Sequence, residues 1–185
     1  MLLAHDHSEL DAALAAFCSA LGAGDVEQSL RNLDLFWARL AMHIRAENLH
    51  LFPALLDASE TASRRAGVPA QETVQEIINR LRADHDFFMS ELAVGMKQLR
   101  ELRRAERHDA TPVLAKVREQ MSRVRSRIEA HNDLEESQVY HWAGAFLDAS
   151  EQNALNEKLQ RELNNLPSRF RGLKKSNENN QDAMT

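Results

Sequence analysis

The sequence predicts an all-α protein, and more specifically an antiparallel four-helix bundle that runs up, down, up and down. Glycine and proline are scarce, with 6 and 4 among 185 residues, which leaves too few turn residues for a barrel or sandwich of short strands. Alanine, leucine, arginine and glutamate are the commonest residues, and this usage favours helices. Four long segments carry apolar residues at three- and four-residue spacing, and only short polar gaps separate them.

The first predicted helix runs from the N-terminus to Gly22. Its apolar stripe advances by three or four residues at a time through Leu3, His7, Leu10, Leu14, Phe17 and Leu21. We expect the helix to end at Gly22-Ala23-Gly24, because glycine accepts the left-handed conformation of a helix C-terminus. Asp25 can then cap the helix that follows.

The second predicted helix passes through Pro53 towards Asp57. One of its faces carries Leu33, Phe36, Leu40, His43, Glu47 and Leu51. Because Pro53 has no N–H group to donate, we expect a kink there. A gap of small and polar residues follows over 58–70.

Two further helices complete the predicted bundle. The stripe of the third contains Ile78, Leu81, His85, Phe88, Leu92, Leu99 and Leu102. In the gap at 107–112 we predict Thr111 as the N-cap and Pro112 as the first helical residue. The stripe of the fourth contains Val117, Met121, Val124, Ile128, His131, Glu135, Val139, Trp142 and Phe146.

We therefore expect the bundle to occupy residues 1–149, a short C-terminal helix 150–166, and a basic segment with a disordered polar tail 167–185. The segment 97–129 contains ten Lys and Arg residues but only five Asp and Glu residues. We expect this stretch to form a basic pole at one end of the bundle and interpret it as a solvated face, with a docking surface for an acidic protein partner or nucleic acid as the alternative. The net charge of −5 gives no reason to expect a nucleic-acid partner.

The N-terminus shows no cationic segment followed by an apolar one, and no apolar run approaches the roughly 20 residues that span a bilayer. The single cysteine, Cys18, excludes an internal disulfide. We expect a cytoplasmic protein without a membrane partner, either a monomer or a dimer.

Six polar residues interrupt the apolar stripes: His7, His43, Glu47, His85, His131 and Glu135. They form an internal repeat, because Asp-His followed by His-x-x-x-Glu occurs once in each half of the chain. The i, i+4 spacing places each Glu about 6 Å along the axis from its His, on the same helix face. Partners on successive helices lie at similar distances from the turn between them. The three hairpins should therefore bring all six residues into one layer.

Such a layer favours metal binding. A buried carboxylate costs several kcal/mol unless it is paired or coordinates a cation. Imidazole and carboxylate together suit iron, manganese or zinc, and a carboxylate can bridge two ions. With two bridging Glu, each ion would have four protein ligands, an oxo or hydroxo bridge as a fifth, and one open position. The alternative is a buried polar network without metal.

The pattern resembles the hemerythrin-like (HHE) cation-binding family, in which His, His-x-x-x-Glu, His and His-x-x-x-Glu follow one another. Residues 43–53 and 131–140 are similar to its second- and fourth-helix signatures, and the resemblance covers roughly residues 1–147. It implies two iron ions, with manganese or zinc as substitutes, held by the six residues. It also implies binding or sensing of O₂, NO or peroxide, or the handling of iron, in a stress response.

One departure narrows this expectation. Met89 stands four residues after His85, where oxygen-carrying hemerythrins have another His, so we do not expect reversible oxygen carriage. A metal-dependent regulatory or interaction module and a di-iron peroxidase or oxidase stay open as alternatives. Of the remaining candidates, we expect His5 to face outward, His50 to lie beside the site or at an interface, and Tyr140 to be a core phenol.

Overall fold

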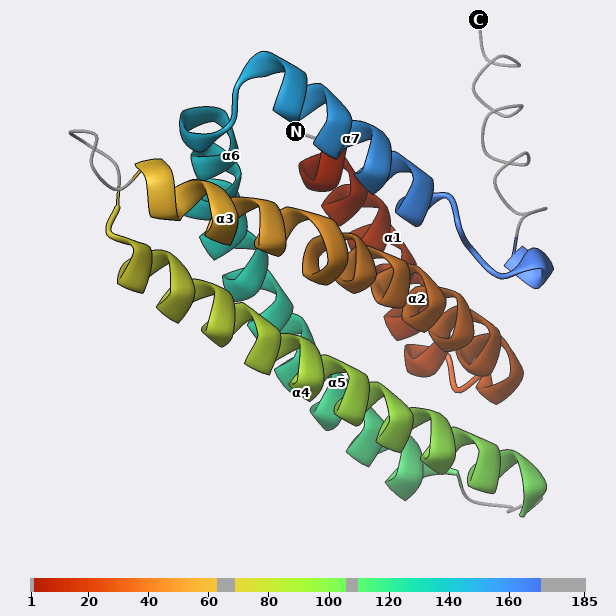
Figure 1. The fold of residues 1–185 in the computed structure, drawn as a ribbon. Coiled ribbons are helices and arrows are strands. Elements are labelled where there is room, and N and C mark those ends of the chain that lie inside the picture. Colours follow the sequence, from red (N-terminus) through yellow and green to blue (C-terminus); the bar gives the residue numbers. More distant parts are fainter. Residues whose placement is uncertain (1, 63–68, 106–109, 171–185) are drawn as a thin grey trace, which may run out of the picture.

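The computed structural model describes residues 2–62, 69–105 and 110–170, and within these ranges it contains helices and no strand (Figure 1). The α-helices are α1 (Leu2–Gly22), α2 (Val26–Ala46), α3 (Phe52–Ala62), α4 (Gln71–Arg104), α5 (Thr111–Leu134), α6 (Tyr140–Phe146) and α7 (Ala149–Leu163). Two π-helical turns, η1 (Glu47–Leu51) and η2 (Glu135–Val139), join α2 to α3 and α5 to α6, and a 3₁₀ turn, η3, spans Ser168–Phe170. The all-α prediction is confirmed.

The long helices pack side by side as a helical bundle. Helix α1 contacts α2 and α5, and α4 contacts the same two helices. The α3 and α6 segments, which continue α2 and α5, also contact each other. Helix α7 lies against α2, η1 and α1 (Figure 1). No described helix is long and apolar enough to cross a membrane.

The turn between α1 and α2 is built as the sequence predicts. Gly24 has φ 75°, in the left-handed region that glycine tolerates best. Asp25 caps α2, because its side chain accepts a hydrogen bond of 2.8 Å from the backbone N–H of Gln28.

Other predicted boundaries need correction. Helix α3 continues to Ala62, past the expected gap start at residue 58. Helix α5 begins at Thr111, so Ala110 rather than Thr111 is its N-cap, and Pro112 is its second residue. This shift costs little because the first-turn N–H groups have no acceptor within the helix. Helix α7 ends at Leu163, earlier than the expected residue 166. The prediction of a polar tail beyond Phe170 falls outside the described residues.

Two hydrophobic clusters fill the bundle. One contains Phe17, Leu33, Phe88 and Val117, and the other contains Phe52, Ile78, Val139 and Trp142, among others. On each long helix the interrupting His lies between members of the two clusters. For example, His85 lies between Leu81 and Phe88. The polar residues therefore form a layer between two apolar clusters.

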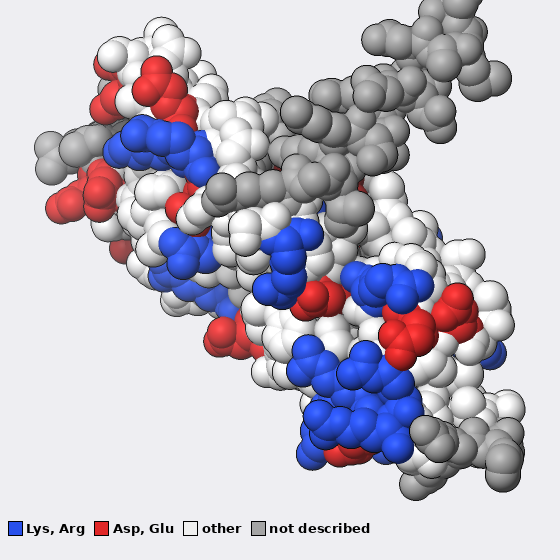
Figure 2. Space-filling view, turned by 90° about the vertical axis from the view of Figure 1, so that its right-hand side faces the viewer, with Lys and Arg blue, Asp and Glu red and all other residues white. Residues whose placement is uncertain are grey.

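The molecule carries a group of basic side chains at the end where α4 finishes, visible in the lower part of Figure 2. Helix α4 contributes the exposed residues Lys97, Arg100, Arg103 and Arg104 there. Two of them are in ion pairs, Lys97 with Glu101 and Arg103 with Glu27. This position agrees with the predicted basic pole, away from the polar layer.

The first turn allows a matched test of backbone conformation. Gly24→Ala should lower the free energy of unfolding by about 1 kcal/mol, because an L-residue is strained at φ 75°. Gly22→Ala should instead leave stability unchanged or raise it by up to about 1 kcal/mol, because Gly22 is helical and a Cβ there meets nothing within 4 Å. Urea denaturation measures both, and equal effects would contradict the assignment of Gly24 as the left-handed residue.

Candidate metal centre

All six polar residues predicted from the sequence meet in one layer. His7, His43, His85 and His131 project from α1, α2, α4 and α5, while Glu47 and Glu135 are the first residues of η1 and η2. None of the six is more than 4% exposed, and both glutamates are fully buried. The layer divides into two halves, because the rings of His7 and His43 lie 4.9 Å apart, as do those of His85 and His131. We call these the His7–His43 half and the His85–His131 half.

Each carboxylate reaches both halves with different oxygens. Glu47 Oε1 lies 3.3 Å from His43 Nε2, and Glu47 Oε2 lies 3.2 Å from His85 Nε2. Glu135 Oε2 lies 3.3 Å from His7 Nε2, and Glu135 Oε1 lies 3.1 Å from His131 Nε2. A carboxylate placed in this way can bridge two cations.

The donor atoms converge on two positions. In the His85–His131 half, Glu47, His85, His131 and Glu135 each offer one atom within 4.8 Å of the others, and in the other half His7, His43 and Glu135 do so. Two carboxylate oxygens, Glu47 Oε2 and Glu135 Oε1, are buried beside the Nε2 atoms of His85 and His131. A buried carboxylate needs a protonated ring or a cation beside it, so these atoms fit a bound cation.

A second set of side chains orients the imidazoles through their Nδ1 atoms. Asp6 lies 2.9 Å from His43 Nδ1, and Asp84 lies 3.3 Å from His131 Nδ1. Each of these Asp residues directly precedes a layer His in the sequence, but it contacts the His of the following long helix. A carboxylate can only accept, so Nδ1 donates, and in a neutral ring Nε2 keeps the lone pair that binds a cation.

Two other supporting residues follow the glutamates directly, and the sequence analysis missed them. Glu136 Oε1 accepts a hydrogen bond of 2.7 Å from His7 Nδ1, whereas Asn48 Nδ2 donates one of 3.3 Å to His85 Nδ1. Asn48 also accepts a hydrogen bond from Arg82. The repeat could have indicated both, because each occupies the position after the Glu of a His-x-x-x-Glu pair.

The π-helical turns begin at the two glutamates. In η1 the N–H of Phe52 donates to the Glu47 carbonyl, and in η2 the N–H of Tyr140 donates to the Glu135 carbonyl. The irregularity expected at Pro53 thus takes the form of a π turn just before it. Proline is not the shared cause, because η2 has none. Such turns are frequent at functional sites.

The π turn brings Tyr140 into the layer. The sequence analysis expected only a core phenol there and no contact with the layer residues. In a regular helix a residue five positions on is rotated by about 140°, whereas a π turn returns it to nearly the same face. The Tyr140 hydroxyl lies 3.1 Å from His7 Nε2, 3.4 Å from Glu47 Oε1 and 3.2 Å from Glu135 Oε2.

Buried charges shift several pKa values in the layer. Burial lowers the pKa of His43, but the Glu47 carboxylate and a hydrogen bond to Asp6 outweigh it and raise that pKa well above 6.5. Burial also lowers the pKa of His131, but its hydrogen bond to the Glu135 carboxylate and the charge of that group outweigh burial and raise the pKa above 6.5. The Glu47 carboxyl pKa is held well below 4.5, because His43 and His85 outweigh burial. Burial and the two glutamates raise the pKa of Tyr140, so its hydroxyl stays protonated.

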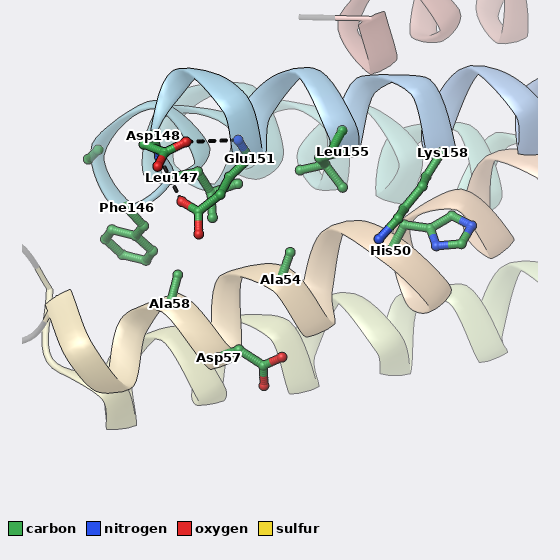
Figure 3. Close-up of a pocket in the computed structure, with 12 residues that line it drawn as sticks. His50, Ala54, Asp57, Ala58, Phe146, Leu147, Asp148, Glu151, Leu155 and Lys158 are labelled. Carbon is green, nitrogen blue, oxygen red and sulfur yellow. Dashed lines mark hydrogen bonds between the residues drawn. The ribbon is translucent and has the colours of Figure 1, made fainter.

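The remaining candidates lie outside the layer. His5 is exposed, as expected, and Met89 packs against a hydrophobic cluster. His50 lines a groove of about 620 Å³ between α3, the end of α6 and α7, where Figure 3 shows it near Lys158. This groove contains none of the six layer residues.

Comparison with known proteins agrees with this geometry. The family model for the hemerythrin HHE cation-binding domain matches residues 2–143. No curated protein and no solved structure gives a significant match. Because the family match covers most of the chain, the protein belongs to the hemerythrin HHE cation-binding domain family.

The raised imidazole pKa values predict how stability depends on pH without metal. A raised folded-state pKa stabilises the fold below the unfolded value of about 6.5, and this contribution is lost as pH rises through the folded value. The lowered pKa of Glu47 has the opposite effect on stability. It stabilises the fold above about pH 4.5, and this contribution is lost as pH falls through the folded-state pKa of Glu47. Metal-free protein should therefore be most stable between these values and weaken above pH 6.5, by up to about 1.4 kcal/mol per pH unit for each imidazole.

Urea denaturation with a chelator, from pH 6 upward, measures this dependence. His43→Gln should flatten the slope, because it removes one of the titrating rings, and His5→Gln should leave the slope unchanged. A free energy of unfolding that is constant or rises above pH 6.5 would show that His43 and His131 do not gain protons on folding.

Proposed function

We propose that this HHE-domain protein holds two iron ions, with His7, His43, His85 and His131 as terminal ligands and Glu47 and Glu135 bridging them. We further propose that it binds or senses O₂, NO or peroxide, or handles iron, in a stress response in the cytoplasm. The observation that carries the proposal is the position of the two buried carboxylates. In each carboxylate, one oxygen lies in the His7–His43 half and the other in the His85–His131 half.

The donor set supports iron. Four imidazoles and two carboxylates give each ion a mixed nitrogen and oxygen environment, which suits iron and also admits manganese or zinc. A metal-free polar network explains the layer less well, because the charge of two fully buried carboxylates would then be balanced by imidazoles alone. We also propose that residues 1–149 form the up-down-up-down bundle, since each of its four long helices supplies an imidazole.

Bound iron supplies one-electron chemistry and a coordination position for a small ligand. The chain supplies orientation and exclusion of water. Asp6 and Asp84 fix two of the rings, and the apolar clusters on both sides keep the layer dry. With only two imidazoles for each ion and Met89 in place of another His, the site favours electron transfer to a bound molecule over its reversible release.

Metal content tests the ligand assignment. Protein reconstituted with ferrous iron should contain two ions per chain, and His43→Ala or His131→Ala should lower this content sharply. His5→Ala is the control, because His5 is exposed and should leave iron content unchanged. Loaded protein should also resist unfolding better, by about 2.7 kcal/mol when free iron exceeds the dissociation constant a hundredfold. Equal loss of iron from His5→Ala would contradict the assignment.

The reaction with oxygen tests the proposed chemistry. Anaerobic ferrous protein mixed with oxygen in a stopped-flow spectrometer should oxidise within minutes, without a long-lived coloured adduct. NO added to the same protein should give an iron-nitrosyl signal. A stable visible band that disappears on deoxygenation would instead indicate an oxygen-storage protein.

A further inference from the structure

The two halves of the layer differ at one pair of equivalent positions. Phe52 and Tyr140 each follow a bridging glutamate by five residues, and each is the first residue after a π turn. Each ring stacks on an imidazole, Phe52 on His85 at 5.9 Å and Tyr140 on His7 at 5.8 Å between centroids. The shared placement makes the hydroxyl of Tyr140 the difference between them.

This hydroxyl lies where a cation in the His7–His43 half would have its ligands. It contacts His7 Nε2, Glu47 Oε1 and Glu135 Oε2, which are the atoms that face that half. In the other half, Glu47 Oε2 and Glu135 Oε1 lie beside the Nε2 atoms of His85 and His131, which are 3.3 Å from each other. Phe52 brings no hydroxyl to the His85–His131 half, whereas the hydrogen-bonded phenol of Tyr140 occupies the His7–His43 half.

We propose that Tyr140 makes metal loading stepwise: the first divalent ion binds in the His85–His131 half, and the second binds in the His7–His43 half by displacing the Tyr140 hydroxyl. This inference rests on the proposed two-metal function and adds the order of loading and the residue that sets it. The first ion uses four convergent donors and replaces the contact between the Nε2 atoms of His85 and His131, whereas the second has three donors and must also displace the phenol.

Charged side chains around the layer favour the opposite order of loading, with the first cation in the His7–His43 half. Asp6 and Glu136 support the His7–His43 half, whereas the other half is near Arg127, bound to Asp84, and Arg82, bound to Asn48. However, the Glu136 side chain is 50% exposed, so water and salt screen its charge. The phenol acts on buried donor atoms directly, and its contacts therefore decide the order.

Anaerobic titration of metal-free protein with Co²⁺ tests this order, with calorimetry and the visible absorption of Co²⁺ as readouts. Wild-type protein should bind two ions in two resolved steps. Repulsion between the ions weakens the second step in every variant, so the change between variants is diagnostic. Tyr140→Phe should tighten the second step about tenfold or more and leave the first step unchanged, because it removes only the hydroxyl.

Three further variants locate the steps. Phe52→Tyr, which places a hydroxyl in the His85–His131 half, should weaken the first step. His131→Ala should remove the tight step, and His43→Ala should remove the weak one. Circular dichroism and thermal unfolding confirm that each variant is folded, and the conservative Tyr140→Phe change keeps the test available if Phe52→Tyr is unstable.

The outcomes separate this inference from the function on which it rests. If neither wild-type protein nor Tyr140→Phe binds a second ion, the two-metal function is wrong. If both bind two ions and the second step is the same in each, Tyr140 does not control loading, while the two-metal function stands. Loss of the tight step in His43→Ala would reverse the proposed order.

Discussion

Two fully buried carboxylates, Glu47 and Glu135, face four imidazoles at the centre of the bundle, and the need to satisfy them shapes the rest of the structure. Each helix of the bundle must supply a histidine at the same height, and the hairpins must be of matched length for this to happen. The apolar clusters on both sides raise the cost of an unpaired charge. A cation in the layer would relieve that cost, so we expect metal binding and folding to be coupled.

The outer hydrogen bonds and the π turns follow from the same constraint. Asp6 and Asp84 each contact the histidine of the next helix and orient the Nε2 atoms of His43 and His131 towards the layer. Both π turns start at the glutamates, and the wider turn brings the residue five positions later onto the site. The two halves thus share a design, and they differ where one half has Phe52 and the other has Tyr140.

The sequence was sufficient to predict the helices, the Gly24 turn and the meeting of six polar residues in one layer, because helical periodicity and hairpin length determine all three. The helix ends at Ala62 and Thr111 were less predictable, since terminal backbone groups tolerate a shift of a residue or more. Tyr140 was missed because regular helical periodicity turns it away from Glu135, and no residue pattern indicated the π turn. Asn48 and Glu136 share the position after the Glu of each pair, but the repeat alone does not show which imidazole each one contacts, because those contacts are with other helices.

The central proposal is that Glu47 and Glu135 share two metal ions. Crystals of protein reconstituted with ferrous iron, measured by anomalous diffraction at the iron absorption edge, test this directly. We predict two anomalous peaks per chain, one beside His85 and His131 and one beside His7 and His43, with both carboxylates between them. No peak in this layer, or a single peak with one carboxylate left unbound, would contradict the account.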